Sequence, residues 1–86
     1  ELNAYTLSDR ATWITFKNKK NLEVLFHNDK KLFNQYGAIL VNPQKCPNTN
    51  MEDSKVFLDW LLSKEGQNTI KKYKVNGVQL FYPNAN

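Results

Sequence analysis

The apolar positions of this chain fall at a helical spacing in one long segment and gather into short runs elsewhere. In that segment four large apolar residues recur at i, i+1, i+4 and i+5, which puts them on one stripe of a helix: Val56, Phe57, Trp60 and Leu61. Asn50 is a good N-cap for this helix, and Glu52 and Asp53 suit the positive end of its dipole. The pattern predicts a helix over residues 51–62.

Three further helical stretches are predicted, two of them from their N-caps. Ser8 or Asp9 is a natural N-cap for a first helix that runs to about Lys17, and Ser63 precedes a helix over residues 64–73. Residues 30–35 suit a single helical turn.

Short apolar runs predict the strands. They occupy residues 2–7, 22–26, 38–41 and 78–82. The run at 38–41 is continuously apolar, which is typical of a strand buried on both faces, and Asn76-Gly77 predicts the turn before the last run. The order strand–helix–strand–strand–helix–helix–strand indicates an α/β or α+β fold.

At 86 residues the chain is expected to form one small domain with a modest core. Its larger aromatic residues are expected to pack in that core rather than form a partner surface: Phe57, Trp60, Tyr73, Phe81 and Tyr82.

The charge is mildly basic, with 12 Lys+Arg against 8 Asp+Glu and a net charge of +4. The basic residues are scattered along the chain, and Arg10 is the one arginine among them. Nucleic-acid-binding proteins usually concentrate arginine. We therefore expect a solvated basic surface and no nucleic-acid partner.

No catalytic constellation stands out. His27 has no Cys, His or carboxylate at metal-ligand spacing, and Cys46 has no nearby base that would make it a nucleophile. The three glycines are far apart, so no phosphate-binding loop is present. The sequence predicts a protein that is not an enzyme, with no metal and no cofactor.

Residues 5–13 carry the clearest chemical suggestion, a strand that runs into a helix start with hydroxyls and a guanidinium nearby. Thr6, Ser8 and Arg10 suit the wall of a small oxyanion site. The alternative is a capped helix with a solvated arginine. Asp9 would repel an anion, and this objection weakens if Asp9 caps the helix or pairs with Arg10 or a lysine. From these residues alone both interpretations stay open.

The same part of the chain, residues 4–13, resembles the late segment of bacterial tungstate-binding proteins, the periplasmic substrate-binding subunits of ABC transporters. The likeness continues through residues 32–39, 41–43 and 57–67, and residues 80–85 resemble the family's chain end. The Ser-x-Glu-Gly-Gln pattern that begins at Ser63 is common near the C-terminus of two-lobed binding proteins in general.

The resemblance implies an α/β fold of two lobes joined by crossover strands, with the oxyanion held between them. Family proteins are about three times longer. Residues 1–86 are therefore expected to be a single C-terminal fragment, a partial lobe of a few strands with flanking helices that includes the crossover region. The implied ligand is tungstate or a similar oxyanion such as molybdate, bound by Arg10, Thr6 and Ser8 without catalysis. Whether Arg10 contacts the anion or orders the hinge stays open.

The implied partners are the oxyanion, the missing N-terminal portion of the same protein and an ABC permease subunit. The implied location is the periplasm, with a lipoprotein anchor left open. Without the missing portion, apolar faces at residues 57–60 and 78–82 should be exposed, and the fragment should dimerise or swap elements. A freestanding basic α/β protein-interaction module and an RNA-binding module are the alternatives. The genomic reading frame tests the freestanding module, and salt-dependent retention on polyanions tests the RNA-binding module.

Overall fold

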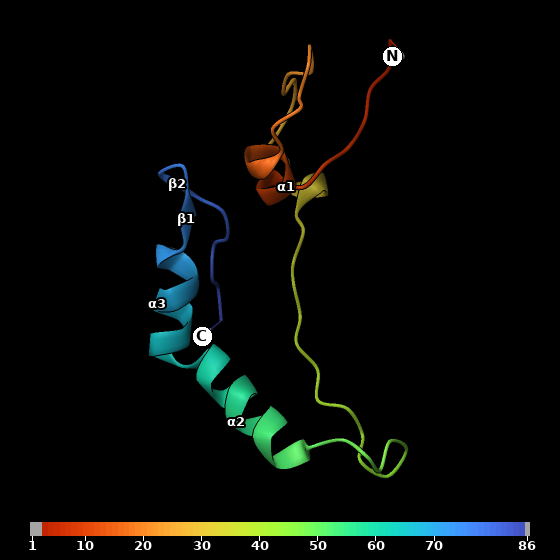
Figure 1. Ribbon diagram of the computed structural model, residues 1–86, viewed down its shortest axis with the longest axis vertical. Helices are drawn as coiled ribbons and strands as arrows, with labels where there is room; N and C mark the ends of the chain where they lie inside the picture. Colours follow the sequence, from red (N-terminus) through yellow and green to blue (C-terminus); the bar gives the residue numbers. More distant parts are fainter. Residues whose placement is uncertain (1–2, 86) are drawn as a thin grey trace.

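The computed structural model describes residues 3–85, and two consecutive helices form its largest regular part (Figure 1). Helix α2 spans Met51–Leu62 and helix α3 spans Lys64–Lys72. The side chain of Asn50 accepts a hydrogen bond from the Asp53 N–H at 3.0 Å and donates one to the Asp53 carboxylate at 2.7 Å. The predicted bounds of α2 are confirmed, and α3 ends one residue earlier than predicted.

Ser63 forms the corner between these helices. Its N–H donates to the Trp60 carbonyl at 3.0 Å, which closes α2, and its hydroxyl accepts from the Gly66 N–H at 3.1 Å, which opens α3. Gly66 is buried and lies so close to the end of α2 that a Cβ there would collide with the Trp60 carbonyl and lie 2.9 Å from the Leu61 Cα. Ser63 therefore ends α2 and starts α3.

A short β-hairpin with a two-residue turn follows α3. Strand β1 (Lys74–Val75) pairs antiparallel with β2 (Val78–Gln79). Asn76 and Gly77 both have positive φ, 53° and 76°, as expected for the tight turn that suits twisted strands. The predicted turn is confirmed, but the predicted strand over 78–82 forms only at its first two residues.

Residues 80–85, here called the C-terminal tail, leave the hairpin and run back past α3 (Figure 1). Leu80 begins this tail, and it is the single buried apolar side chain among residues 3–85, at 6% exposed.

The N-terminal part contains two short helical elements. Helix α1 spans Arg10–Thr15 and begins at Asp9, whose carboxylate accepts from the Thr12 N–H at 3.0 Å. Phe16 has extended backbone, so α1 ends two residues before the predicted Lys17. The 3₁₀ helix η1 spans Lys30–Leu32, and Asp29 caps it through the Lys31 N–H at 2.8 Å. It forms the first half of the helical turn predicted over 30–35.

Three of the predicted strands are wrong for the described residues. Residues 3–7, 22–26 and 38–41 are not strands, and Leu2, the first residue of the first predicted strand, lies outside the described part. A strand is stabilised by pairing with a neighbour, and β1 with β2 is the one pair within residues 3–85. Ile39 is 91% exposed, so the run predicted to be buried on both faces is open to solvent.

The described chain is elongated and does not enclose an aromatic core. Its extents are 50 × 29 × 26 Å and its radius of gyration is 17.5 Å, against about 12 Å for a compact chain of this length. Phe57 and Trp60 stack on each other with ring centroids 6.2 Å apart, yet Phe57 is 61% exposed, and Tyr73 and Tyr82 are exposed as well. The predicted aromatic core is therefore wrong. The expected exposure is confirmed for Phe57, Trp60, Val78 and Tyr82, and is wrong for Leu80, which is buried.

The secondary structure combines helices with a two-stranded sheet. The prediction that the fold contains both α and β elements is confirmed. None of the helices in the described part is long and apolar enough to cross a membrane.

Candidate functional site

The three predicted site residues lie around the start of α1, in what we call the 6–10 segment. Thr6 and Ser8 precede the helix in non-helical backbone, and Arg10 is its first residue. All three are exposed. The Ser8 hydroxyl donates to the neighbouring Asp9 carbonyl at 3.0 Å. The 6–10 segment is thus one open surface, and these side chains do not line an enclosed pocket within it.

Arg10 is held from one side. Its Nη2 donates to Oδ1 of Asn28 at 2.9 Å, and Asn28 adopts a left-handed backbone with φ of 64°, which asparagine tolerates better than most residues. A guanidinium carries five N–H donors in a planar fork, so this single bond orients Arg10 and leaves donors for an anion. The arginine is exposed but anchored, which differs from a freely solvated one.

Asp9 is engaged by hydrogen-bond donors rather than by Arg10. One carboxylate oxygen accepts from the Thr12 N–H, and the other accepts from the Tyr36 hydroxyl at 3.4 Å. Hydrogen bonds from the Thr12 side chain and backbone lower the pKa of the Asp9 carboxyl; Tyr36 adds to this and burial opposes it. The predicted N-cap role of Asp9 is confirmed, and it weakens the objection to an anion beside Arg10.

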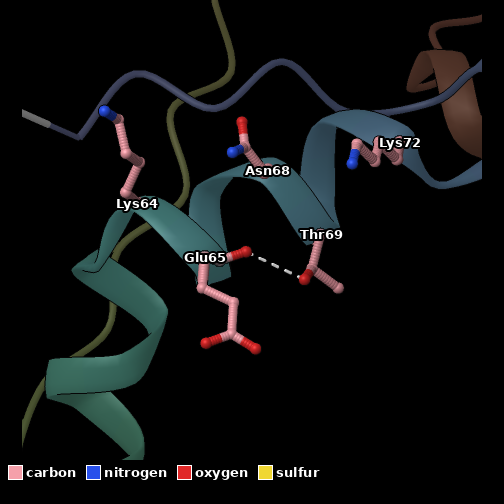
Figure 2. A pocket seen from close by; sticks show the side chains of 5 residues that line it. All are labelled: Lys64, Glu65, Asn68, Thr69 and Lys72. Atoms are coloured by element: carbon pink, nitrogen blue, oxygen red, sulfur yellow. Dashed lines mark hydrogen bonds between the residues drawn. The ribbon is translucent and has the colours of Figure 1, made fainter.

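Two open hollows lie elsewhere, along α3. One has a volume of about 460 Å³, and Figure 2 shows the side chains that line it: Lys64, Glu65, Asn68, Thr69 and Lys72. The Thr69 hydroxyl donates to the Glu65 carbonyl at 2.9 Å, so its proton is already bonded within the helix. A second, more apolar hollow of about 490 Å³ includes Ile70 and Phe81. Neither contains a residue of the 6–10 segment.

His27 and Cys46 are both exposed. The Cys46 thiol is free, and the backbone N–H of Cys46 donates to the Asn42 carbonyl at 2.9 Å. Over residues 3–85 there is no group of three or more His, Cys, Asp or Glu residues placed to hold a metal ion. The chemistry that the described residues do offer is hydrogen bonding and positive charge at Arg10.

Sequence reasoning missed two residues of this region, Asn28 and Tyr36. Asn28 lies 18 residues from Arg10, and Tyr36 lies 27 residues from Asp9. The available signal for Asn28 was its place in a polar stretch that suits a left-handed turn. Tyr36 carried no chemical signal of its own.

Comparison with curated proteins finds relatives along nearly the whole chain. The tungstate-binding protein TupA of Peptoclostridium acidaminophilum is 44% identical over 87 residues, covering 99% of this chain and 30% of that protein. A Haloferax volcanii protein provisionally described as an ABC transporter anion-binding protein is 42% identical over 87 residues, covering 95% of this chain and 25% of that protein. No family model matches the chain, and no solved structure matches it at a significant level.

Both relatives are named for the binding of a solute and neither is named for a reaction. The chain spans less than a third of their length, and the matched region is their C-terminal part. This chain is therefore similar, over 95% or more of its length, to the C-terminal part of a tungstate-binding protein and of an anion-binding protein, which confirms the resemblance inferred from its sequence.

Proposed function

We propose that this chain is the C-terminal part of the solute-binding component of an ABC importer. The whole protein would bind tungstate or a similar tetrahedral oxyanion such as molybdate, in the periplasm, and deliver it to the membrane permease. The observation that carries the proposal is the 44% identity to a tungstate-binding protein over 99% of this chain.

The chemistry at the start of α1 is suited to this role. Arg10 supplies a positive charge and several N–H donors, and the Thr6 hydroxyl supplies a neutral donor near it in the chain. The Ser8 hydroxyl would have to exchange its bond to the Asp9 carbonyl for one to the anion. Such groups replace the water shell of a dianion, and charge-assisted hydrogen bonds are the stronger ones. Binding of this kind needs no bond to be made or broken, so the proposed protein is not an enzyme.

The exposure of the 6–10 segment fits a site that is completed by other parts of the protein. An oxyanion is held tightly when donors surround it in a site shielded from water. Thr6, Ser8 and Arg10 are open to solvent here, so they would form one wall. The N-terminal portion would supply the opposite wall, and closure of the two lobes would exclude water and discriminate by cavity size.

Isothermal titration calorimetry of the full-length gene product with sodium tungstate tests this function. We expect saturable binding, and a loss of affinity of about tenfold or more in Arg10→Ala, because hydrogen bonds to charged groups contribute about 1.5–3 kcal/mol. Lys55→Ala, an exposed cation on α2, is the matched control and should bind as the wild type does.

The outcomes separate the parts of the proposal. A full-length protein that binds neither tungstate nor molybdate contradicts the function. Unchanged affinity in Arg10→Ala removes this arginine from the site while leaving the function intact.

A further inference from the structure

Tyr36 lies between two regions that are far apart in the sequence. Its hydroxyl donates to the Asp9 carboxylate at 3.4 Å, and its ring meets the Phe81 ring edge to face, with centroids 5.8 Å apart and planes at 74°. This geometry is a favourable arrangement for two aromatic rings. One side chain thus contacts both the start of α1 and the C-terminal tail.

Gln35 makes a second connection at the same place. Its amide forms two reciprocal hydrogen bonds with the amide of Asn84, at 3.2 Å from Gln35 to Asn84 and 2.7 Å from Asn84 to Gln35. Paired bonds of this kind fix an orientation as well as a distance. We call Gln35, Tyr36, Phe81 and Asn84 the Tyr36 joint.

The tail side of this joint is itself tied to the helices. The Ala85 N–H donates to the Gln67 side chain at 3.0 Å, and the Gln67 amide donates to the Leu61 carbonyl at 2.8 Å. Gln67 lies on α3 and Leu61 on α2, so one side chain attaches the tail at the corner between them. Buried Leu80 holds the other end of the tail.

A continuous path of contacts therefore runs from the corner of α2 and α3, through the C-terminal tail and Tyr36, to Asp9. Asp9 is the N-cap of α1 and is adjacent to Arg10. Because both Asp9 oxygens are occupied by Thr12 and Tyr36, the carboxylate is held by donors other than Arg10, whose guanidinium bonds to Asn28.

We propose that Tyr36 is a positioning residue, which fixes the 6–10 segment relative to the corner of α2 and α3 by linking Asp9 to the C-terminal tail. Its bearing on oxyanion binding rests on the proposed function, whereas the mechanical link does not. Tyr36 acts through Asp9 and does not itself touch the anion. Since coupling between sites is reciprocal, an oxyanion that orders the 6–10 segment also orders the tail.

Amide hydrogen exchange of the full-length gene product, without any oxyanion, tests the link. Tyr36→Phe removes the hydroxyl and keeps the ring, so exchange should quicken at the Thr12 and Trp13 N–H groups, which bond to Asp9, and stay unchanged at Ala85. Tyr36→Ala removes both contacts, so exchange should quicken at Ala85 as well. Tyr82→Phe and Tyr82→Ala are the matched controls, since Tyr82 is 66% exposed beside Phe81.

The link is overturned if Tyr36→Phe leaves exchange at Thr12 and Trp13 at the wild-type rate. That comparison needs only the conservative variant, so it holds even if Tyr36→Ala fails to fold. Quickening in the Tyr82 variants equal to that in the Tyr36 variants would also overturn it.

Calorimetry with sodium tungstate then tests the positioning role. Tyr36→Phe should bind tungstate more weakly by up to about tenfold, because the 6–10 segment loses one intramolecular hydrogen bond that orders it, with at most a small fall in melting temperature, and Tyr82→Phe should bind normally. Unchanged affinity in Tyr36→Phe overturns the positioning role and leaves the function standing. A wild-type protein that binds no tungstate contradicts the function, and hydrogen exchange alone then decides the link.

Discussion

At the scale of single residues, Asp9 connects the local structure of this chain with its candidate chemistry. The carboxylate begins α1, receives the Tyr36 hydroxyl and lies next to Arg10. Asp9 keeps its negative charge beside the proposed anion site, and the same charge stabilises a helix start. The protonation of this one group therefore bears on both α1 and the 6–10 segment.

The helix start at Asp9 should weaken in acid. Its pKa is lowered from the ordinary value of 3.8, chiefly by the hydrogen bonds from Thr12. The folded pKa therefore lies below the unfolded one, so the stabilisation is present above pH 3.8 and is lost as the pH falls through the folded pKa. An NMR titration should show the Thr12 amide proton moving toward its unbonded shift below pH 3.8.

Asp9→Asn is the control for this titration, because asparagine also caps helices and does not ionise in this range. The variant should keep the Thr12 hydrogen bond throughout. If the Thr12 amide titrates in the same way in Asp9→Asn, another group is responsible for the acid sensitivity.

A side chain at position 66 should lower the free energy of unfolding. A Cβ at this position would collide with the Trp60 carbonyl and approach the Leu61 Cα at 2.9 Å, and both are backbone atoms that cannot rotate away. Gly66→Ala should cost about 1–3 kcal/mol, the range for overpacking. Gly37→Ala is the matched control, since a Cβ there meets nothing within 4 Å. Urea denaturation compares the two, and equal stability would show that the corner adjusts without cost.

At the scale of elements, the helices were predictable and the strands were not. Helix hydrogen bonds close within a few residues, so the caps Asn50 and Ser63 determine where α2 and α3 begin. A strand depends on a partner that the sequence does not reveal. The hairpin is the exception, because Asn76-Gly77 brings its two strands together locally.

The same distinction applies to the candidate site. Thr6, Ser8 and Arg10 could be proposed from the sequence because they are neighbours in the chain and flank a helix start. Asn28 and Tyr36 were missed because their contacts span 18 and 27 residues. Local chemistry can be read from sequence, whereas the side chains that orient it depend on tertiary structure.

Helix α2 should depend on its N-cap. The Asn50 side chain satisfies the Asp53 N–H, which has no partner inside the helix, so Asn50→Ala should cost about 0.5–2 kcal/mol. Asn50→Ser keeps an oxygen acceptor and should restore most of it. Hydrogen exchange at Asp53 should be faster in the alanine variant alone. Equal exchange rates in both variants would mean that the cap is dispensable.

At the scale of the whole molecule, the described chain has apolar surface that it cannot cover itself. Large side chains remain exposed in every part of it, among them Leu25, Phe26, Phe33, Ile39, Phe57 and Tyr82. So many large exposed apolar side chains in a chain of 86 residues are more than a self-contained domain usually leaves uncovered. The open shape and the match to less than a third of each relative have the same explanation under the proposed function: the remaining portion packs against these faces.

The 86-residue chain on its own should therefore self-associate. Burial of apolar surface contributes about 25 cal/mol per Å², and without the remaining portion a second copy is the nearest source of such burial. Light scattering at high concentration should give a mass above the 10.1 kDa of one chain. Phe57→Gln removes an exposed ring from the α2 stripe and should lower that mass, whereas Tyr5→Gln, at a 91% exposed side chain outside the helices and strands, should not. A monodisperse monomer would show that these faces need no cover, and the chain would then have to be regarded as a freestanding module rather than as part of a larger binding protein.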